Sequence, residues 1–202
     1  KLSPSISLKN TLGDYTYRAN FSQSYRSPSL KELYYDFGDH PGGFPIIGNE
    51  DLKPSSSDYY SFSIESRKYL NNSLELYYNH ATNMIANKFE QLNDETVYKY
   101  HNYKSVNLYG FNLNLSFNPL KDITLKSVYS YTGASSSHED ILDGISAHSL
   151  NLRLKYNFNN NFNFIFSSKY NSSKIVDTSL EDENNLRTEM IIPEYFISNV
   201  SV

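Results

Sequence analysis

Histidine is the residue type best suited to ligand chemistry in this chain, because the sequence has no cysteine and no recognisable catalytic motif. It contains no nucleophile elbow, no phosphate-binding glycine loop and no paired-carboxylate motif. The five histidines are His40, His80, His101, His138 and His148, and they show no metal-ligand spacing. The sequence therefore predicts a protein that is not an enzyme and that requires no cofactor.

His40 is distinguished from the other histidines by its neighbours. It stands two residues before the pair Gly42-Gly43, and the aromatic residues near it are Tyr34, Tyr35, Phe37 and Phe44. A neutral imidazole can ligate a metal ion, and aromatic rings can stack on a flat ligand. Two interpretations stay open at this point. His40 is either a ligand-binding residue or an ordinary exposed residue of a loop.

These residues belong to a chain whose pattern predicts β-strands almost from end to end. Apolar and polar residues alternate with period two in the stretches 15–21, 108–117, 123–131, 150–158 and 162–168. One slip of the alternation near Gly110 indicates a β-bulge. We expect roughly nine or ten strands from this periodicity. The one helical candidate is 28–37, where Pro28 can start a helix and Leu30, Leu33 and Tyr34 share a face.

Two classes of connection alternate along the chain. Short polar turns are expected at 71–72, 118–122 and 159–161, and long irregular loops at 26–57, 91–96, 133–146 and 172–192. No apolar run approaches the roughly 18 residues of a transmembrane helix, whereas a transmembrane strand needs only about 9–11 residues. The pattern favours an all-β fold of antiparallel up-and-down strands, a partial transmembrane β-barrel. The alternative is a soluble β-sandwich that binds carbohydrate on tyrosine rings.

The net charge and the tyrosine content indicate which kinds of partner to expect. The formal net charge is -4, which argues against a nucleic-acid binder held by phosphate contacts. The 19 tyrosines suit the aromatic girdles of a barrel embedded in lipid, and some of them could instead contact a ligand from the loops. Outer-membrane lipid is therefore an expected partner.

Two segments carry a resemblance to a known family. The first motif is YRSPSLKELY at residues 25–34, and the second motif is GNEDLKP at residues 48–54. They resemble the "FRAPSLKELY" and "GNPDLKPE" segments of TonB-dependent outer-membrane receptors, in the same order and at similar spacing. The chain departs from the family pattern at Tyr25, Ser27 and Glu50. Residues 74–85 resemble a family strand that breaks off into an extracellular loop, and 103–115 and 145–156 resemble two later strands.

The resemblance implies a location and a mechanism. It places residues 1–202 in the β-barrel domain, as a fragment that lacks a signal peptide, the plug domain and the remaining strands of a barrel of about 22 strands. Such receptors lie in the bacterial outer membrane, where extracellular loops capture a large, scarce nutrient. The TonB complex then acts on the plug to drive uptake.

The resemblance also suggests a ligand. Haem receptors of this family carry a histidine between the two motifs, and His40 occupies that interval. Haem or a haem-protein is accordingly the first expectation, with His40 as the iron ligand and the nearby aromatic residues stacked on the porphyrin. Haem would be transported cargo and not a cofactor. Cobalamin and ferric siderophores are the alternatives within the family.

The motif residues themselves allow two roles. The family pattern is carried by Tyr25, Arg26, Ser27, Pro28, Asn49, Glu50, Asp51 and Leu52. Pro28 fixes the backbone where the strand ends, and Asn49 and Asp51 can cap the turn that enters the next strand. In the alternative role, both motifs only form turns and do not contact a ligand. Arg26 then pairs with a carboxylate of the barrel wall or of the plug.

Overall fold

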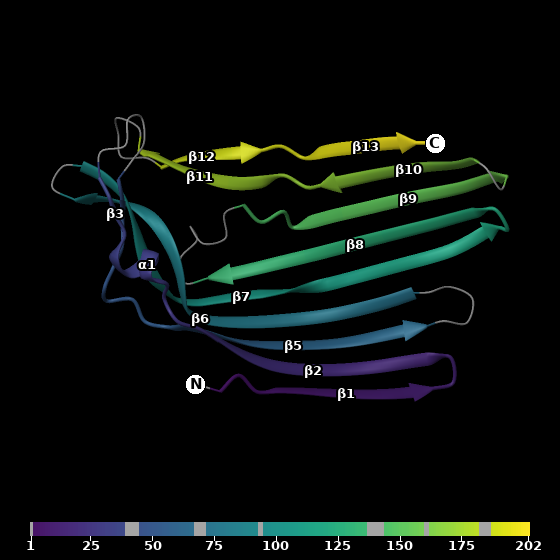
Figure 1. Ribbon diagram of the computed structural model, residues 1–202, viewed down its shortest axis with the longest axis horizontal. Helices are drawn as coiled ribbons and strands as arrows, with labels where there is room; N and C mark the ends of the chain where they lie inside the picture. The colour runs from purple at the N-terminus through teal and green to yellow at the C-terminus, as the bar shows by residue number, and fades with distance from the viewer. Residues whose placement is uncertain are drawn as a thin grey trace.

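The computed structural model describes residues 2–38, 45–66, 72–92, 95–136, 144–159, 162–181 and 187–202. Most of them form one broad, curved antiparallel sheet (Figure 1). Its main strands follow in spatial order as β1 (Ser5–Leu12), β2 (Tyr15–Arg26), β5 (Ser55–Ser66), β6 (Asn72–Leu92), β7 (Glu95–Leu120), β8 (Ile123–Ser136), β9 (His148–Asn159), β10 (Phe162–Asn171) and β13 (Tyr195–Ser201). Each strand thus pairs with the next long strand along the chain, and the all-β, up-and-down prediction is confirmed.

The remaining elements are short and lie at one end of the sheet. They are α1 (Leu30–Tyr34), β3 (Asp36–Phe37), β4 (Ile46–Ile47) and the separate hairpin of β11 (Lys174–Glu181) and β12 (Arg187–Ile192). Figure 1 shows α1 and β3 at the left end and the turns after β1, β7 and β9 at the right end. The predicted separation of long connections from tight turns is therefore confirmed. In the described part of the chain, no helix is long and apolar enough to cross a membrane.

The two faces of the sheet differ in polarity, because side chains alternate across a strand. On one face, a row of register partners consists of Leu8, Ala19, Phe62, Leu76, Phe111 and Tyr131. These side chains are not covered by a second layer, since Phe62 is 43% exposed and Leu76 is 49% exposed. An uncovered apolar face contradicts the soluble sandwich, whose apolar residues pack against another sheet.

The opposite face is polar and bonded across the strands. Arg18 lies 3.0 Å from Glu65, and the Asn20 amide donates to Ser61 at 3.1 Å. On the same face, the Tyr77 hydroxyl lies 2.9 Å from Thr132 Oγ1. We call this the inner face, because a barrel with an apolar outer surface turns its polar side chains toward the lumen.

The predicted bulge at Gly110 is wrong. The β6–β7 and β7–β8 registers run through Gly110 without a shift, opposite Tyr77 and Thr132. The alternation slips in the sequence because Leu108 points to the inner face opposite Asn79, and not to the apolar face. A Cβ atom at Gly110 would overlap the Tyr131 carbonyl oxygen and lie 2.9 Å from the Tyr77 hydroxyl. The glycine is thus required by a close approach and not by a bulge.

Two predicted loops are in fact regular structure. Within the expected loop 91–96, residues 91–92 and 95–96 belong to a long hairpin, because β6 and β7 pair from Ser73 opposite Asn114 to Leu92 opposite Glu95. The strand expected to break off after Ile85 therefore continues to Leu92, with one interruption at Asn83, which has a φ of 51°. The expected loop 172–192 contains the β11–β12 hairpin. The expected helix 28–37 is reduced to Leu30–Tyr34.

Candidate functional site

The first motif folds into a capped helical turn. Ser29, and not Pro28, is the N-cap of α1: its hydroxyl accepts from Glu32 N at 3.2 Å, and its own N–H donates to Glu32 Oε2 at 2.7 Å. This reciprocal capping box satisfies two amide groups that a helix start leaves unpaired. Arg26 Nη1 donates to both carboxylate oxygens of Glu32, at 2.8 and 2.9 Å. Arg26 thus pairs with a carboxylate of its own motif and not with one of the barrel wall.

The second motif packs directly against this turn. Asn49 N donates to Glu32 O at 2.8 Å, and Gly48 N donates to Tyr35 O at 2.5 Å. The approach is so close that a Cβ atom on Gly48 would lie 2.7 Å from the carbonyl carbon of Leu33 and 2.8 Å from Tyr34 N. Only glycine allows the two backbones to meet at this distance. We call the two joined motifs, residues 25–38 and 45–54, the clasp.

The clasp is fastened to the long hairpin of β6 and β7. Asn49 Nδ2 donates to Tyr100 O at 2.9 Å, and Tyr98 N donates to Pro45 O at 2.8 Å. Asn102 accepts from Lys53 N at 2.6 Å and donates to Lys53 O at 2.8 Å and to Asn83 O at 2.9 Å. In addition, β4 pairs in parallel with β7. Main-chain and side-chain amide groups of β7 therefore hold the clasp at Pro45, Asn49 and Lys53.

This end of the sheet also holds the buried apolar side chains of the described residues, which are Leu52, Ile85, Val97, Tyr103 and Val106. Leu52 comes from the second motif, and the other four come from β6 and β7. Val97 is only 1% exposed. The buried apolar side chains thus lie at the clasp end, while the sheet between the clasp and the turns has its apolar side chains on an open face.

An aromatic and cationic surface covers the outside of the clasp. The rings of Tyr35 and Phe37 are stacked with centroids 5.7 Å apart and an interplanar angle of 2°, and Lys31 Nζ lies 5.1 Å from the Tyr35 centroid. Tyr34 is 60% exposed beside them. We call these four residues the clasp surface. Flat parallel rings with an adjacent cation can bind a conjugated or anionic ligand.

The structure brings together most of the residues predicted for the site. Asn49 caps the second motif as expected, because its Oδ1 accepts from Asp51 N at 3.0 Å. Ser27 Oγ donates to the Tyr25 hydroxyl at 3.4 Å, and Glu50 is exposed. His40 and Phe44 lie outside the described residues. Among the residues described, no group of three or more His, Cys, Asp or Glu side chains could hold a metal ion.

Asn102 is the site residue that sequence reasoning missed. It lies in β7, 49 residues from the backbone of Lys53 that it binds. A mid-strand asparagine carries no local signal for such a contact. The described histidines contact residues outside the clasp surface: His80 Nδ1 lies 2.6 Å from Asn107 Oδ1, His101 Nε2 lies 2.9 Å from Glu90 Oε2, and His148 Nδ1 lies 2.8 Å from the Tyr129 hydroxyl.

The Glu32 carboxylate makes the clasp sensitive to acid. Burial would raise the pKa of Glu32, but the hydrogen bonds from Ser29 and Arg26 outweigh it and hold the pKa below the ordinary 4.5. A carboxyl with a lowered folded pKa stabilises the fold above its unfolded pKa, and this contribution is lost as pH falls through the folded pKa.

We therefore expect residues 26–38 to lose protection from hydrogen exchange as the pH is lowered below 4.5. Glu32→Gln should give part of this loss already at pH 7 and should remove the further loss in acid. Glu50→Gln, an exposed change in the second motif, is the matched control and should behave as the parent. An identical acid response in Glu32→Gln and the parent would contradict the role of Glu32.

Comparison with known proteins agrees with this architecture. The family model "TonB dependent receptor-like, beta-barrel" matches residues 1–202. Similar solved structures include the siderophore receptor PirA from Acinetobacter baumannii (TM-score 0.72, 15% identity), the ferric enterobactin receptor PfeA from Pseudomonas aeruginosa as the Q482A mutant in complex with enterobactin (0.76, 17%) and the copper transporter OprC (0.76, 14%). Each alignment covers 98% of this chain, and 34%, 32% and 30% of the respective structure. No curated protein matches the sequence. The chain thus spans about a third of the length of the structures whose fold it shares.

Proposed function

The chain belongs to the TonB-dependent receptor β-barrel family, and from this premise we propose that residues 1–202 form part of the barrel of a receptor that imports a large, scarce nutrient. Barrels of this family reside in the bacterial outer membrane, and its members are transport receptors and not enzymes. In the proposed protein, a plug domain closes the lumen and the TonB complex drives uptake through it. Outer-membrane lipid covers the apolar face.

The observation that carries the proposal is the clasp. A loop that captures a ligand must hold its contact groups in place, because ordering them at the moment of binding costs affinity. Here Gly48, Asn49 and Asn102 fix the loop backbone to α1 and β7. The fixed loop exposes Tyr34, Phe37 and Lys31 at the end of the sheet opposite the tight turns.

We infer that the ligand is an iron complex. The similar structures PirA and PfeA are a siderophore receptor and a ferric enterobactin receptor, which supports a ferric siderophore. Haem is the second candidate, and the observation that favours it is the stacked pair Tyr35–Phe37, which flanks the sequence interval of His40. A porphyrin would stack on the rings, and His40 would supply the axial ligand. Cobalamin, which contains cobalt and not iron, is the alternative to an iron complex through family membership alone.

The test uses the full-length receptor, expressed in a host that lacks its own receptors. Ferric enterobactin and haemin serve as probes, and both binding and growth on each iron source are measured. Lys31→Ala combined with Tyr35→Ala and Phe37→Ala should weaken binding of the true ligand about tenfold or more, since cation–π and ring contacts contribute about 0.5–1.5 kcal/mol each. Leu30→Ala, an exposed change on the same helix, should have no effect.

The single variant His40→Ala separates the candidates. Selective loss of haemin binding would support haem, whereas unchanged haemin binding would remove His40 from the site. Binding of ferric enterobactin that is lost in the triple variant and kept in His40→Ala would support the siderophore. A receptor that binds a probe equally well with and without the triple substitution would overturn the role of the clasp surface.

A further inference from the structure

One carboxylate of the long β6–β7 hairpin contacts two side chains of the strand to which the clasp is fastened. Glu90 lies on β6, and its Oε1 is 3.3 Å from Lys99 Nζ on β7. Its Oε2 is 2.9 Å from His101 Nε2 on the same strand. Lys99 and His101 share a face of β7, because side chains alternate across a strand. We call Glu90, Lys99 and His101 the hairpin latch, and their side chains are between 25% and 28% exposed.

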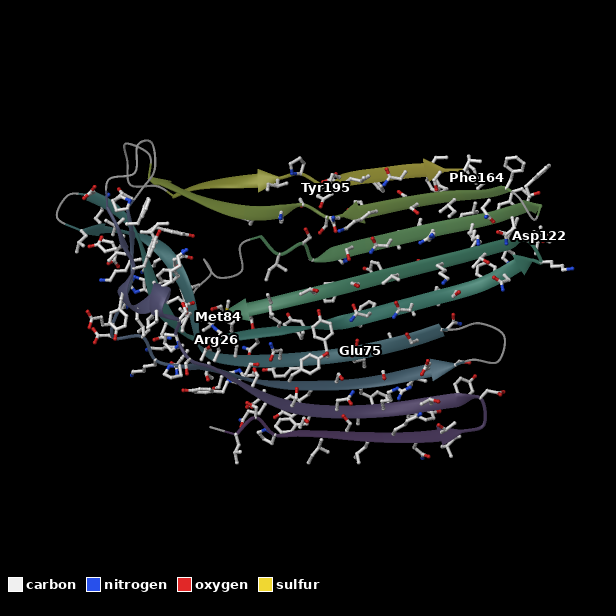
Figure 2. The ribbon with its side chains drawn as sticks, in the orientation of Figure 1. Arg26, Glu75, Met84, Asp122, Phe164 and Tyr195 are labelled. Atoms are coloured by element: carbon white, nitrogen blue, oxygen red, sulfur yellow. The ribbon has the colours of Figure 1, made fainter. Side chains whose placement is uncertain are left out.

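The contact between Glu90 and His101 requires the hairpin to coil. In the β6–β7 ladder the register partner of Glu90 is Val97, and His101 lies four residues further along β7. Four residues span about 13 Å of a regular strand, which is more than these two side chains bridge when the strands are flat. Figure 1 shows the hairpin curving where it extends past the main sheet, at the end opposite the turn marked by Asp122 in Figure 2. Val97 is 1% exposed and Tyr103 is 4% exposed, so the face that carries the latch also holds buried apolar side chains.

The latch residues of β7 alternate with the groups that hold the clasp. Those groups are Tyr98 N, Tyr100 O and the side-chain amide of Asn102. Along the chain, Lys99 lies between the first two groups and His101 lies between the last two. The latch and the clasp therefore share one stretch of backbone, and a change in the curvature of this stretch moves all three attachment points together.

Glu90 supplies negative charge to a face with several basic groups. Lys88 of β6 is the register partner of Lys99, and like charges directly opposite one another destabilise a sheet. Burial lowers the pKa of His101 below the ordinary 6.5 and outweighs Glu90, which raises it, while Lys88 and Lys99 lower it further. His101 is therefore uncharged at neutral pH. A histidine with a lowered folded pKa stabilises the fold above its unfolded pKa, and this contribution is lost as the pH falls through the folded pKa.

We propose that Glu90 is a positioning residue for ligand capture, which sets the curvature of β7 and thereby the place of the clasp. It acts through Lys99 and His101 and does not belong to the clasp surface. Without the charge of Glu90, Lys88 and Lys99 lie opposite each other without this counter-charge, and we expect the hairpin to uncoil. The inference rests on the proposed function, because it takes the clasp as the element that captures the ligand.

Hydrogen exchange of the purified full-length receptor, measured by mass spectrometry without ligand, tests the inference. Glu90→Gln keeps the shape of the side chain and removes its charge. We expect exchange of residues 97–103 and of the clasp residues 45–54 to become about fivefold faster, the effect of losing a partly exposed ion pair. Glu95→Gln, an exposed change of equal charge in the same hairpin, is the control and should leave both segments unchanged. Faster exchange of 97–103 alone would overturn the inference, because the latch would then act only on its own strand.

A pH profile of the same clasp segment applies even if Glu90→Gln does not assemble. In the parent receptor, protection of residues 45–54, corrected for intrinsic exchange, should fall as the pH is lowered from 6.5 through the folded pKa of His101. His101→Gln keeps an amide donor but does not titrate, so it should remove this dependence. The pH stays above 4.5, where the acid response of Glu32 begins. A parent without this loss of protection, or the same loss in His101→Gln, contradicts the role of the latch. Because neither measurement needs a nutrient or TonB, a receptor that imports none of the probes above can still satisfy both.

Discussion

Gly48→Ala is expected to weaken ligand capture by the proposed full-length receptor at least tenfold while leaving the barrel assembled. The added Cβ atom would lie within 2.8 Å of three backbone atoms of Leu33 and Tyr34, and backbone atoms cannot move aside as a flexible side chain can. Overpacking of this kind costs about 1–3 kcal/mol. Because the second motif is held to α1 through Gly48 and Asn49, we expect the two motifs to separate. Binding of the iron complex should fall at least tenfold.

The measurement is probe binding to whole cells, normalised to receptor at the surface. Gly38→Ala is a matched control, because it lies in the same connection and a Cβ atom there would meet nothing within 4 Å. Equal binding by the two variants would show that contact between the motifs is not needed for capture. Loss of the Gly48→Ala protein from the membrane would instead show that the clasp is needed for assembly.

Gly110→Ala is expected to prevent assembly of the barrel itself. The new Cβ atom would overlap the Tyr131 carbonyl oxygen of β8 and contact the Tyr77 hydroxyl. To relieve this overlap, β7 and β8 must move apart at the position where Phe111 and Tyr131 are register partners. We expect destabilisation of about 3 kcal/mol, the upper part of the usual range for overpacking.

Folded barrels resist detergent and migrate differently in gels before and after heating, and this difference gives the readout for Gly110→Ala. Asn112→Ala is the control, because it lies two residues further along the same face and loses only its hydrogen bond to Glu75. Its cost should be about 1 kcal/mol. A Gly110→Ala barrel that assembles as well as Asn112→Ala would show that β7 and β8 have more room than this geometry allows.

The strands were predictable because their two faces meet different surroundings. Alternation in β2, β8 and β9 follows directly from one apolar and one polar face, and the sequence shows it. Beyond Thr82, β6 and β7 extend past the sheet and the alternation is no longer required, so the long hairpin was not visible in the sequence. The bulge at Gly110 was predicted wrongly because Leu108 is an apolar residue on the inner face. Such a residue shifts the apolar–polar alternation in the same way as a change of register.

Within the clasp, only contacts between residues close in sequence could be predicted. Ser29 and Glu32 are three residues apart, and this spacing alone indicates a capping box. The attachment to Asn102 and Tyr100 joins residues 49 and 51 positions apart, and a single sequence holds no signal for such pairs. Glu32 was not predicted as the partner of Arg26, because the two side chains meet only through the single helical turn of α1.

The order of the strands has a consequence for how the protein folds. Each long strand pairs with the next long strand in the chain, so the sheet can grow one hairpin at a time, and the entropy lost in closing each loop stays small. The bonds of the clasp are different, because Asn49 can find Tyr100 only after β5, β6 and β7 are in place. Folding kinetics should therefore show sheet formation first and clasp closure as a later step. The clasp surface would then form only on strands that have already paired in the correct register.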